Sequence, residues 1–150
     1  MVTFSSPKHG RRETVTAPVP VRTSETHPMN VSWVAKSNSG GRFGLTFCPG
    51  KTVCRGGVRW SRSLDMDLDR LKSNFGVTSI LCLLSQAELA SLQLRHYGEG
   101  VQSKDIQLLT FPIVEMQAPD SMKKTAALVD LLQTKYTVAS MSVTEVWFAG

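Results

Sequence analysis

One cysteine beside a basic turn is the first place in this chain where residue types and spacing could do chemistry. The segment LTFCPGKT places Cys48 next to a Pro-Gly-Lys turn, which suggests either a phosphate-binding loop or a reactive thiolate. A phosphate-binding loop needs a glycine five positions before Gly50, and that position is Leu45. A reactive thiolate needs a nearby positive charge or helix N-terminus, and only Lys51 and Arg55 stand close in sequence. We therefore predict that Cys48 is a buried residue at the end of a strand.

The other cysteines and the histidines indicate no further chemistry of their own. Cys54 and Cys82 complete an odd set of 3 cysteines without a close pair, which argues against a disulfide framework and fits a reducing compartment. Cys82 lies within the apolar run SILCLL and is predicted to be a core residue. The 3 histidines are scattered along the chain, so no metal-ligand spacing is present and no metal site is predicted.

Charge is distributed unevenly along the chain. The formal net charge is +5, but residues 1–62 hold 10 basic and 2 acidic residues, whereas residues 63–150 hold 7 and 10. Long-range attraction depends on the sign of charge, so a basic N-terminal half could attract nucleic acid, acidic lipid or a phosphorylated protein. Charge runs also serve solubility alone, and a solvated, partly disordered arm is the simpler interpretation.

The composition divides the chain into three parts. Residues 1–38 mix Ser, Thr, Pro and basic residues with isolated apolar ones, which predicts a disordered basic tail. A domain is expected over residues 39–136, followed by an atypical C-terminal tail over residues 137–150. No apolar run approaches the ~18 residues of a membrane-spanning helix. We predict a cytoplasmic protein, with a nuclear location or organelle targeting by the N-terminal tail as open alternatives.

Within the domain the apolar pattern alternates between strand and helix. FGLTF has the content of a short strand, and the apolar residues from Leu64 to Phe75 recur at helical spacing, with acidic residues in the first turns and Gly76 as a stop. Residues 77–84 and 106–113 are nearly continuous apolar runs. Such runs are typical of strands covered on both faces in a parallel sheet.

Two further helices are predicted. Ser85 and Glu88 form a capping-box signature for a second helix, which Gly98 and Gly100 are expected to end. A third helix carries one apolar stripe consisting of Met122, Ala126, Val129 and Leu132. The alternating order of strands and helices predicts an α/β fold, with a mostly parallel sheet and flanking helices.

Three segments stand in a recognisable order: LTFCPGKT, RWSRSLDMDLDRLKSNFGVTSILCLLSQAEL and FPIVEMQAPD. In order and spacing they resemble the first two-thirds of the kinase-associated phosphatases, the cyclin-dependent kinase inhibitor 3-like branch of the dual-specificity protein phosphatases. The resemblance covers residues 43–136 and implies an incomplete cysteine-phosphatase fold. It also implies removal of phosphate from tyrosine, serine and threonine side chains of proteins, without a metal or organic cofactor.

The chemistry that the resemblance implies needs three parts. A thiolate attacks phosphorus, an arginine and backbone amides hold the phosphoryl oxygens, and a carboxylic acid protonates the leaving oxygen. In that family the thiolate and arginine belong to a His-Cys-x5-Arg loop, after the strand that follows the third helix. Here the residues six positions beyond the three cysteines are Cys54, Trp60 and Glu88, and the segment TVASMSVTEVWFAG holds no Cys, His or Arg. We therefore assign no nucleophile and no phosphate-binding residue.

The third part, the acid, has two candidates. The resemblance places Glu115 of FPIVEMQAPD where the family usually has an aspartate, and Asp120 is a nearby alternative. Glutamate is one methylene longer, so its reach differs. A solvated loop carboxylate, with Asp120 capping the third helix, is the competing interpretation.

Three arginines around Trp60 form a candidate binding patch. Arg55, Arg59 and Arg62 with an interleaved aromatic residue are one possible pattern for RNA or DNA binding. The resemblance instead places Arg62 just before the first helix. The competing interpretation is a surface cluster in which Trp60 anchors that helix to the sheet.

These features predict a phosphatase-family chain that is inactive in the form given. It is either a truncated product whose tail after Tyr136 replaces the true strand and loop, or a non-catalytic relative that binds a cyclin-dependent kinase or another phosphoprotein. Nucleic-acid binding through the basic N-terminal half is a third class of function. If the central strand is missing, SILCLL and IQLLTF should lose apolar cover and expose an edge prone to aggregation.

Overall fold

The computed structural model of the chain describes residues 18–36, 42–113, 119, 121–138 and 142–146. This part of the chain forms two β-sheets and four helices. The strands of the larger sheet are β2 (Ser32–Lys36), β3 (Arg42–Thr46), β6 (Ser79–Cys82), β7 (Gln107–Thr110) and β8 (Ser142–Val146). The smaller sheet consists of β1 (Val21–Arg22), β4 (Thr52–Arg55) and β5 (Val58–Ser61). The helices are α1 (Leu64–Phe75), α2 (Gln86–Ser91), α3 (Tyr97–Gln102) and α4 (Met122–Val138).

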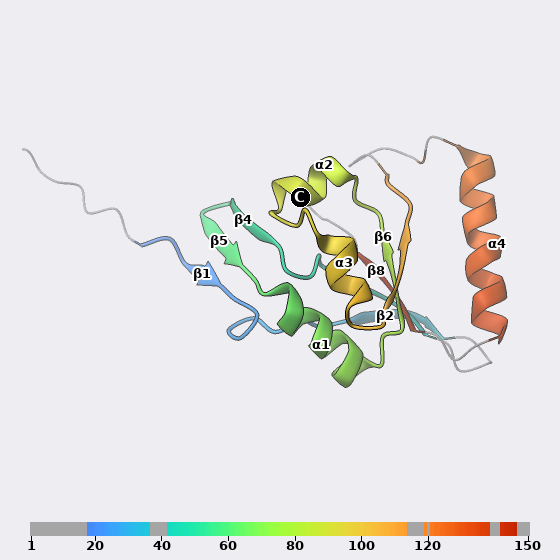
Figure 1. Ribbon diagram of the computed structural model, residues 1–150, viewed down its shortest axis with the longest axis horizontal. Coiled ribbons are helices and arrows are strands. Elements are labelled where there is room, and N and C mark those ends of the chain that lie inside the picture. The colour runs from blue at the N-terminus through green and yellow to red at the C-terminus, as the bar shows by residue number, and fades with distance from the viewer. Residues whose placement is uncertain (1–17, 37–41, 114–118, 120, 139–141, 147–150) are drawn as a thin grey trace, which may run out of the picture.

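The larger sheet has the order β2-β3-β8-β6-β7. The pairs β3 with β8, β8 with β6, and β6 with β7 are parallel, and only β2 runs antiparallel to its neighbour. Helices α1, α2 and α3 lie on one side of this sheet and α4 lies on the other (Figure 1). The predicted α/β fold with a mostly parallel sheet and flanking helices is confirmed.

The central strand of the larger sheet comes from the segment that was predicted to be an atypical tail. β8 pairs with β3 on one side and with β6 on the other. All four residues of β6 are buried, so the expected loss of apolar cover over SILCLL is wrong. β7 forms an edge of the sheet, and its residues are partly or fully exposed. The strand-like composition of residues 142–146 suits this pairing, although the segment lacks the Cys, His and Arg residues that the resemblance leads one to expect.

Helix α1 has the predicted start and stop. The Ser63 hydroxyl caps its N-terminus by accepting a hydrogen bond from the Met66 amide, and Gly76 ends it in the left-handed conformation with φ 67°. The Gly76 amide donates to the Lys72 carbonyl, which would otherwise be one of the helix's unpaired terminal carbonyls. The buried side of α1 includes Leu68 and Leu71, as its apolar spacing predicts.

The region after β6 differs from its prediction in one respect. The capping box of Ser85 and Glu88 is present at the start of α2. However, Gly98 and Gly100 do not end a helix, because both lie inside α3. A Cβ atom on Gly100 would lie 2.6 Å from a methyl carbon of Leu64. The glycine therefore allows α3 to approach α1 closely, and this packing overrides the low helix propensity of glycine.

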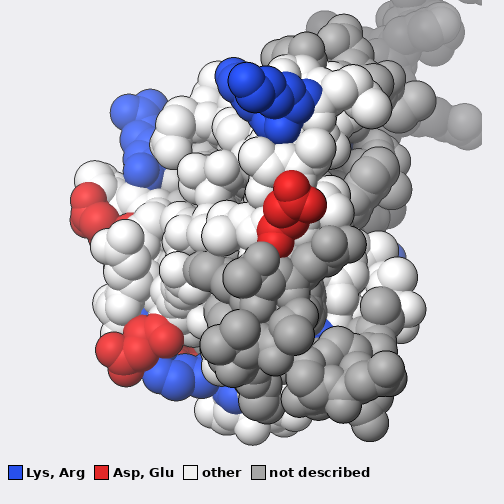
Figure 2. Space-filling model, turned by 90° about the vertical axis from the view of Figure 1, so that its right-hand side faces the viewer, with Lys and Arg blue, Asp and Glu red and all other residues white. Residues whose placement is uncertain are grey.

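Helix α4 contradicts the predicted apolar stripe. Met122, Ala126 and Val129 are exposed, whereas Thr125 and Leu128 are half-buried. Leu132 also belongs to the predicted stripe, but its side chain lies outside the described residues. Figure 2 shows the face of the molecule on the α4 side, where the charged side chains of the described residues are scattered and much of the surface is uncharged. Among the described side chains of α4, the predicted apolar stripe is therefore not a buried face.

The folded part of the chain begins before residue 39. β1 and β2 both lie within the segment predicted as a disordered tail. Met29 is fully buried and Val31 is 5% exposed, and both belong to the main hydrophobic cluster. The Thr46 hydroxyl also donates to the Asn30 carbonyl at 2.7 Å. Two isolated apolar residues are therefore enough here, because Met29 and Val31 enter a core built by the rest of the domain, whereas Val19, Val21 and Val34 stay exposed.

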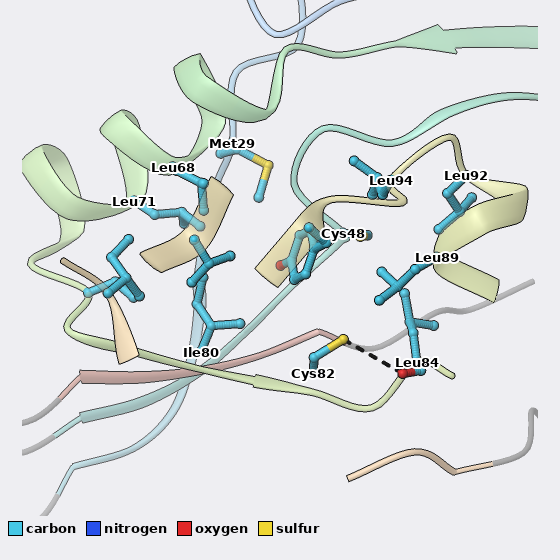
Figure 3. Packing of buried hydrophobic residues seen from close by; sticks show 14 of the residues in the cluster. Met29, Cys48, Leu68, Leu71, Ile80, Cys82, Leu84, Leu89, Leu92 and Leu94 are labelled. Atoms are coloured by element: carbon cyan, nitrogen blue, oxygen red, sulfur yellow. Dashed lines mark hydrogen bonds between the residues drawn. The ribbon is translucent and has the colours of Figure 1, made fainter. Parts of the chain in front are cut away.

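The core lies between the larger sheet and the helices of one side. Met29, Leu68, Leu71 and Ile80 gather beneath α1, and Leu84, Leu89, Leu92 and Leu94 continue the cluster beneath α2 (Figure 3). Cys48 and Cys82 are also members of this cluster. Two of the three cysteines are thus part of the core.

Candidate functional site at the C-terminal edge of the sheet

The parallel strands bring several loops to one edge of the larger sheet. β3, β8, β6 and β7 run in the same direction, so their C-terminal ends meet at this edge, where open α/β sheets commonly bind ligands. Cys48 follows β3, Cys82 ends β6, and residues 111–113 follow β7. The predicted acid candidates Glu115 and Asp120 lie outside the described residues. Of the edge, the structure therefore describes the two thiols and the start of the loop after β7.

Cys48 is a buried core residue, as predicted. Its side chain is 0% exposed, and its Sγ lies 3.6 Å from the Pro49 carbonyl oxygen. Burial raises the pKa of the Cys48 thiol well above its ordinary value, and the nearby Cys82 raises it further. A thiol held in its neutral form is a poor nucleophile. Cys48 therefore has neither the access nor the charge that attack on phosphorus requires.

Cys82 has a similar environment at the end of β6. Its Sγ lies 3.9 Å from the Leu84 carbonyl oxygen, the contact drawn as a dashed line in Figure 3. Burial raises the pKa of its thiol as well, although the Leu84 contact opposes this shift. Cys54 is the one exposed cysteine, and it lies on β4 in the smaller sheet. Within the described residues, no group of three His, Cys, Asp or Glu side chains could hold a metal ion.

A buried ion pair connects this edge to the rest of the domain. Arg62 and Asp67 form two hydrogen bonds of 2.7 Å, from Nε to Oδ2 and from Nη2 to Oδ1, and both side chains are 0% exposed. Asp67 Oδ2 also accepts from the Gly50 amide at 2.9 Å. Arg62 Nη1 donates to the carbonyls of His27 and Thr23. Each charge thus has several partners, which is the condition for burying a charged pair.

The Pro-Gly turn of LTFCPGKT is fixed against the start of α1. Gly50 has φ 73°, and a Cβ atom there would lie 2.7 Å from the Leu64 Cβ. Only glycine fits this position without displacement of the helix. The turn is therefore a structural joint between β3 and α1, and it is not a phosphate-binding loop.

A surface hollow of about 590 Å³ lies beside this joint. It is lined by residues from the start of β4 and from the segment between α2 and α3, including Thr52, Arg95, His96 and Tyr97. Its lining contains no carboxylate and no cysteine. The described lining therefore holds neither the cysteine nor the carboxylic acid that the phosphatase scheme requires.

The three arginines of the predicted patch point to different places. Opposite residues of paired strands share a face, and alternate residues along a strand do the same. Val53 pairs with Trp60, so Arg55 lies on the Trp60 face of the smaller sheet, while Arg59 pairs with Cys54 on the other face. Arg62 is buried in its pair with Asp67. The sequence grouping of these arginines is therefore not a single surface.

Other cations do gather around Trp60. The Arg22 guanidinium lies 5.1 Å from the ring centroid of Trp60, and the Lys51 ammonium lies 4.3 Å from it. Trp60 in turn packs against Phe47, with ring centroids 5.7 Å apart. Sequence reasoning missed Arg22 and Lys51 because they belong to segments far from Trp60. The pairing of β1 with β5 sets Arg22 opposite Trp60, and the pairing of β4 with β5 brings Lys51 to the same ring.

No model of a protein family matches the chain, and no curated protein sequence matches it. One solved structure does: a crystal structure of kinase-associated phosphatase in which the catalytic-site cysteine is replaced by serine. The TM-score is 0.67 at 21% sequence identity, and the match covers 81% of this chain and 66% of that one.

The chain has the fold of a dual-specificity phosphatase. At this level of identity the likeness concerns the fold alone, and the chain spans about two thirds of the solved chain that it matches. None of the described helices is long and apolar enough to cross a membrane.

Proposed function

We propose that this chain is a phosphatase-fold protein that does not hydrolyse phosphoesters and that instead binds a phosphoprotein, such as a cyclin-dependent kinase. One observation carries the inactive half of the proposal: Cys48 and Cys82, the described thiols at the C-terminal edge, are buried and held protonated. Within the given sequence, the residues after Val146 include neither a thiol nor an arginine. The resemblance assigns Glu115 as the general acid, and under this proposal Glu115 has no leaving group to protonate.

Hydrolysis is tested with the purified chain and p-nitrophenyl phosphate, with and without vanadate. We expect no turnover above that of a buffer blank, because attack requires an accessible thiolate. A Cys48→Ser/Cys54→Ser/Cys82→Ser variant serves as the control for contaminating phosphatases. Turnover that vanadate inhibits and that the triple variant lacks would overturn the inactive half of the proposal.

Binding is tested separately with purified cyclin-dependent kinases in phosphorylated and dephosphorylated forms. We expect association that depends on phosphorylation and that leaves the phosphate content of the kinase unchanged. If none of the phosphorylated kinases associates with the chain at micromolar concentration, the binding half of the proposal is wrong for this partner.

The origin of the missing loop has a test of its own. The transcript beyond the codon for Tyr136 should contain no in-frame His-Cys-x5-Arg segment if the chain is a genuine non-catalytic relative. Such a segment would identify a truncated product of an active phosphatase, and the proposal would then apply only to this form of the chain.

A further inference from the structure

The smaller sheet presents a basic face that is separate from any catalytic loop. We define the Trp60 face as Arg22, Lys51, Arg55 and Trp60. Register places Arg22 opposite Trp60, and the alternation along β4 places Lys51 and Arg55 on the same face. These residues come from three different strand segments. They converge only because β5 lies between β1 and β4.

The cations of the Trp60 face are close enough for the arginines to lower the pKa of Lys51. Burial lowers the pKa of Lys51, and the positive charges of Arg62, Arg22 and Arg55 lower it further, although the Cys48 thiol opposes these effects. Arg62 is balanced by Asp67. Within the part of the chain that the structure describes, no ion pair joins Arg22 or Arg55 to a carboxylate. The described ion pairs involve Arg62, Lys72, His96 and Lys104 instead.

The aromatic residue of this face does not favour nucleic acid. Single-stranded RNA or DNA is bound through bases that stack on aromatic rings held out for them. Trp60 is half-buried, and its ring is already contacted by Arg22, Lys51 and Phe47. It therefore acts as a platform that holds the cations in place. Converging cations suit a compact anion of high charge, because one phosphate group offers three acceptor oxygens to several donors.

We propose that the Trp60 face binds a phosphorylated side chain of a partner protein, with Arg22, Lys51 and Arg55 contacting the phosphate. This inference rests on the binding half of the proposed function, for which it names a surface and a ligand group. Arginine clusters of this kind are a recurrent means of phosphopeptide recognition. The surface requires no nucleophile and no loop at the C-terminal edge of the larger sheet.

The test measures fluorescence anisotropy of labelled peptide libraries with a fixed phosphoserine, phosphothreonine or phosphotyrosine in a degenerate sequence. Unphosphorylated libraries, libraries with glutamate at the fixed position, and a single-stranded RNA oligonucleotide are the comparison probes. We expect the full chain to bind at least one phosphorylated library and to lose about tenfold or more in affinity in an Arg22→Glu/Arg55→Glu variant. Arg59→Glu reverses one charge on the opposite face and should change the affinity less than about twofold, whereas Arg55→Glu alone, the equivalent single reversal on the Trp60 face, should weaken binding more than that. Circular dichroism melts of each variant verify that the fold is retained.

Each other outcome overturns the inference. Absence of binding to every phosphorylated library, equal binding of the glutamate library, or stronger binding of RNA would each contradict phosphate recognition. An equal loss in Arg59→Glu would show a general charge effect. Kinase association that survives Arg22→Glu/Arg55→Glu would leave the proposed function standing while refuting the Trp60 face as its site.

Discussion

At the scale of single residues, the pair of Arg62 and Asp67 joins segments that are distant in the sequence. Asp67 accepts a hydrogen bond from the Gly50 amide, and Arg62 donates hydrogen bonds to the carbonyls of Thr23 and His27. A buried pair stabilises a fold only when its remaining hydrogen-bonding groups are also satisfied. The N-terminal segment, the Pro-Gly turn and the first turn of α1 therefore depend on the same two side chains.

Replacing one member of this pair should be costly. We expect Asp67→Asn to lower the free energy of unfolding by about 3–5 kcal/mol, because it leaves the Arg62 charge buried without its counter-charge. Asp65→Asn is the matched control, since Asp65 pairs with Lys104 at the exposed surface and should cost about 0–1 kcal/mol. Urea denaturation followed by circular dichroism measures both. Equal costs would show that the Arg62–Asp67 pair has no special role.

Gly50 provides a second test at the same joint. Gly50→Ala should lower the free energy of unfolding by about 2–5 kcal/mol, since the new Cβ meets Leu64 and the φ of 73° is strained for alanine. Gly57 has φ 71° but open space where the alanine methyl group would lie, so Gly57→Ala should cost only about 1–2 kcal/mol. The same urea titrations compare the two. A cost for Gly57→Ala as large as that for Gly50→Ala would contradict the close packing of the turn on α1.

The residue patterns predicted helix caps more reliably than they predicted contacts between side chains of different elements. The Gly76 stop and the capping box of Ser85 and Glu88 are local, because each involves residues within one helical turn. Asp67 is predicted only as an acidic residue near the start of a helix, and its burial follows from a tertiary contact with Arg62. The chemistry expected at Glu115 and Asp120 stays a prediction, since both residues lie outside the described part of the chain.

At the scale of elements, the sequence failed to predict the strands whose own apolar pattern is weak and which are stabilised by pairing with other segments. The hairpin of β4 and β5 turns at Gly56 and Gly57, both with positive φ, which suits a two-residue hairpin. Its strands are short and carry basic residues, so their apolar alternation is weak. By contrast, α1 and β6 carry their own apolar pattern and were predicted correctly. Residues 142–146 have a strand-like composition, but their segment was expected to be an atypical tail because it holds no Cys, His or Arg where the resemblance places the catalytic loop.

The position of α4 predicts an unusual tolerance to substitution. We expect Val129→Lys to change the free energy of unfolding by less than about 0.5 kcal/mol, because Val129 is 44% exposed. Leu68→Ala in α1 should cost about 2–5 kcal/mol, since Leu68 is fully buried. Thermal and urea denaturation of the two variants measure the contrast. A loss of more than about 2 kcal/mol in Val129→Lys would show that α4 packs through this side chain.

At the scale of the whole molecule, three buried groups that lose a proton at alkaline pH should make the fold less stable as the pH rises. Burial raises the pKa of Cys48, Cys82 and Tyr97 in the folded state. The folded chain therefore keeps protons that the unfolded chain releases, and the free energy of unfolding falls as pH rises. Lys51 opposes this trend, because its lowered pKa means that the folded chain binds fewer protons at that site.

We expect stability to be nearly constant between pH 7 and 8 and to fall above about pH 9, by up to about 1.4 kcal/mol per pH unit for each group. Tyr97→Phe is the control. The Tyr97 hydroxyl is buried without a hydrogen-bond partner among the described residues, so its removal should cost little at pH 7 and should flatten the decline above about pH 10. Urea titrations across this pH range measure both effects. An unchanged pH profile in Tyr97→Phe would contradict the contribution of this hydroxyl.

The central position of β8 also has a consequence for biosynthesis. The ribosome makes β3 and β6 well before residues 142–146, yet these two strands have no direct pairing with each other in the finished sheet. During translation each one therefore presents an open edge toward the gap that β8 will fill. Such edges are sites of intermolecular pairing in incomplete chains. The yield of soluble protein should thus depend on how quickly β8 inserts or on chaperones that shield the gap until it does.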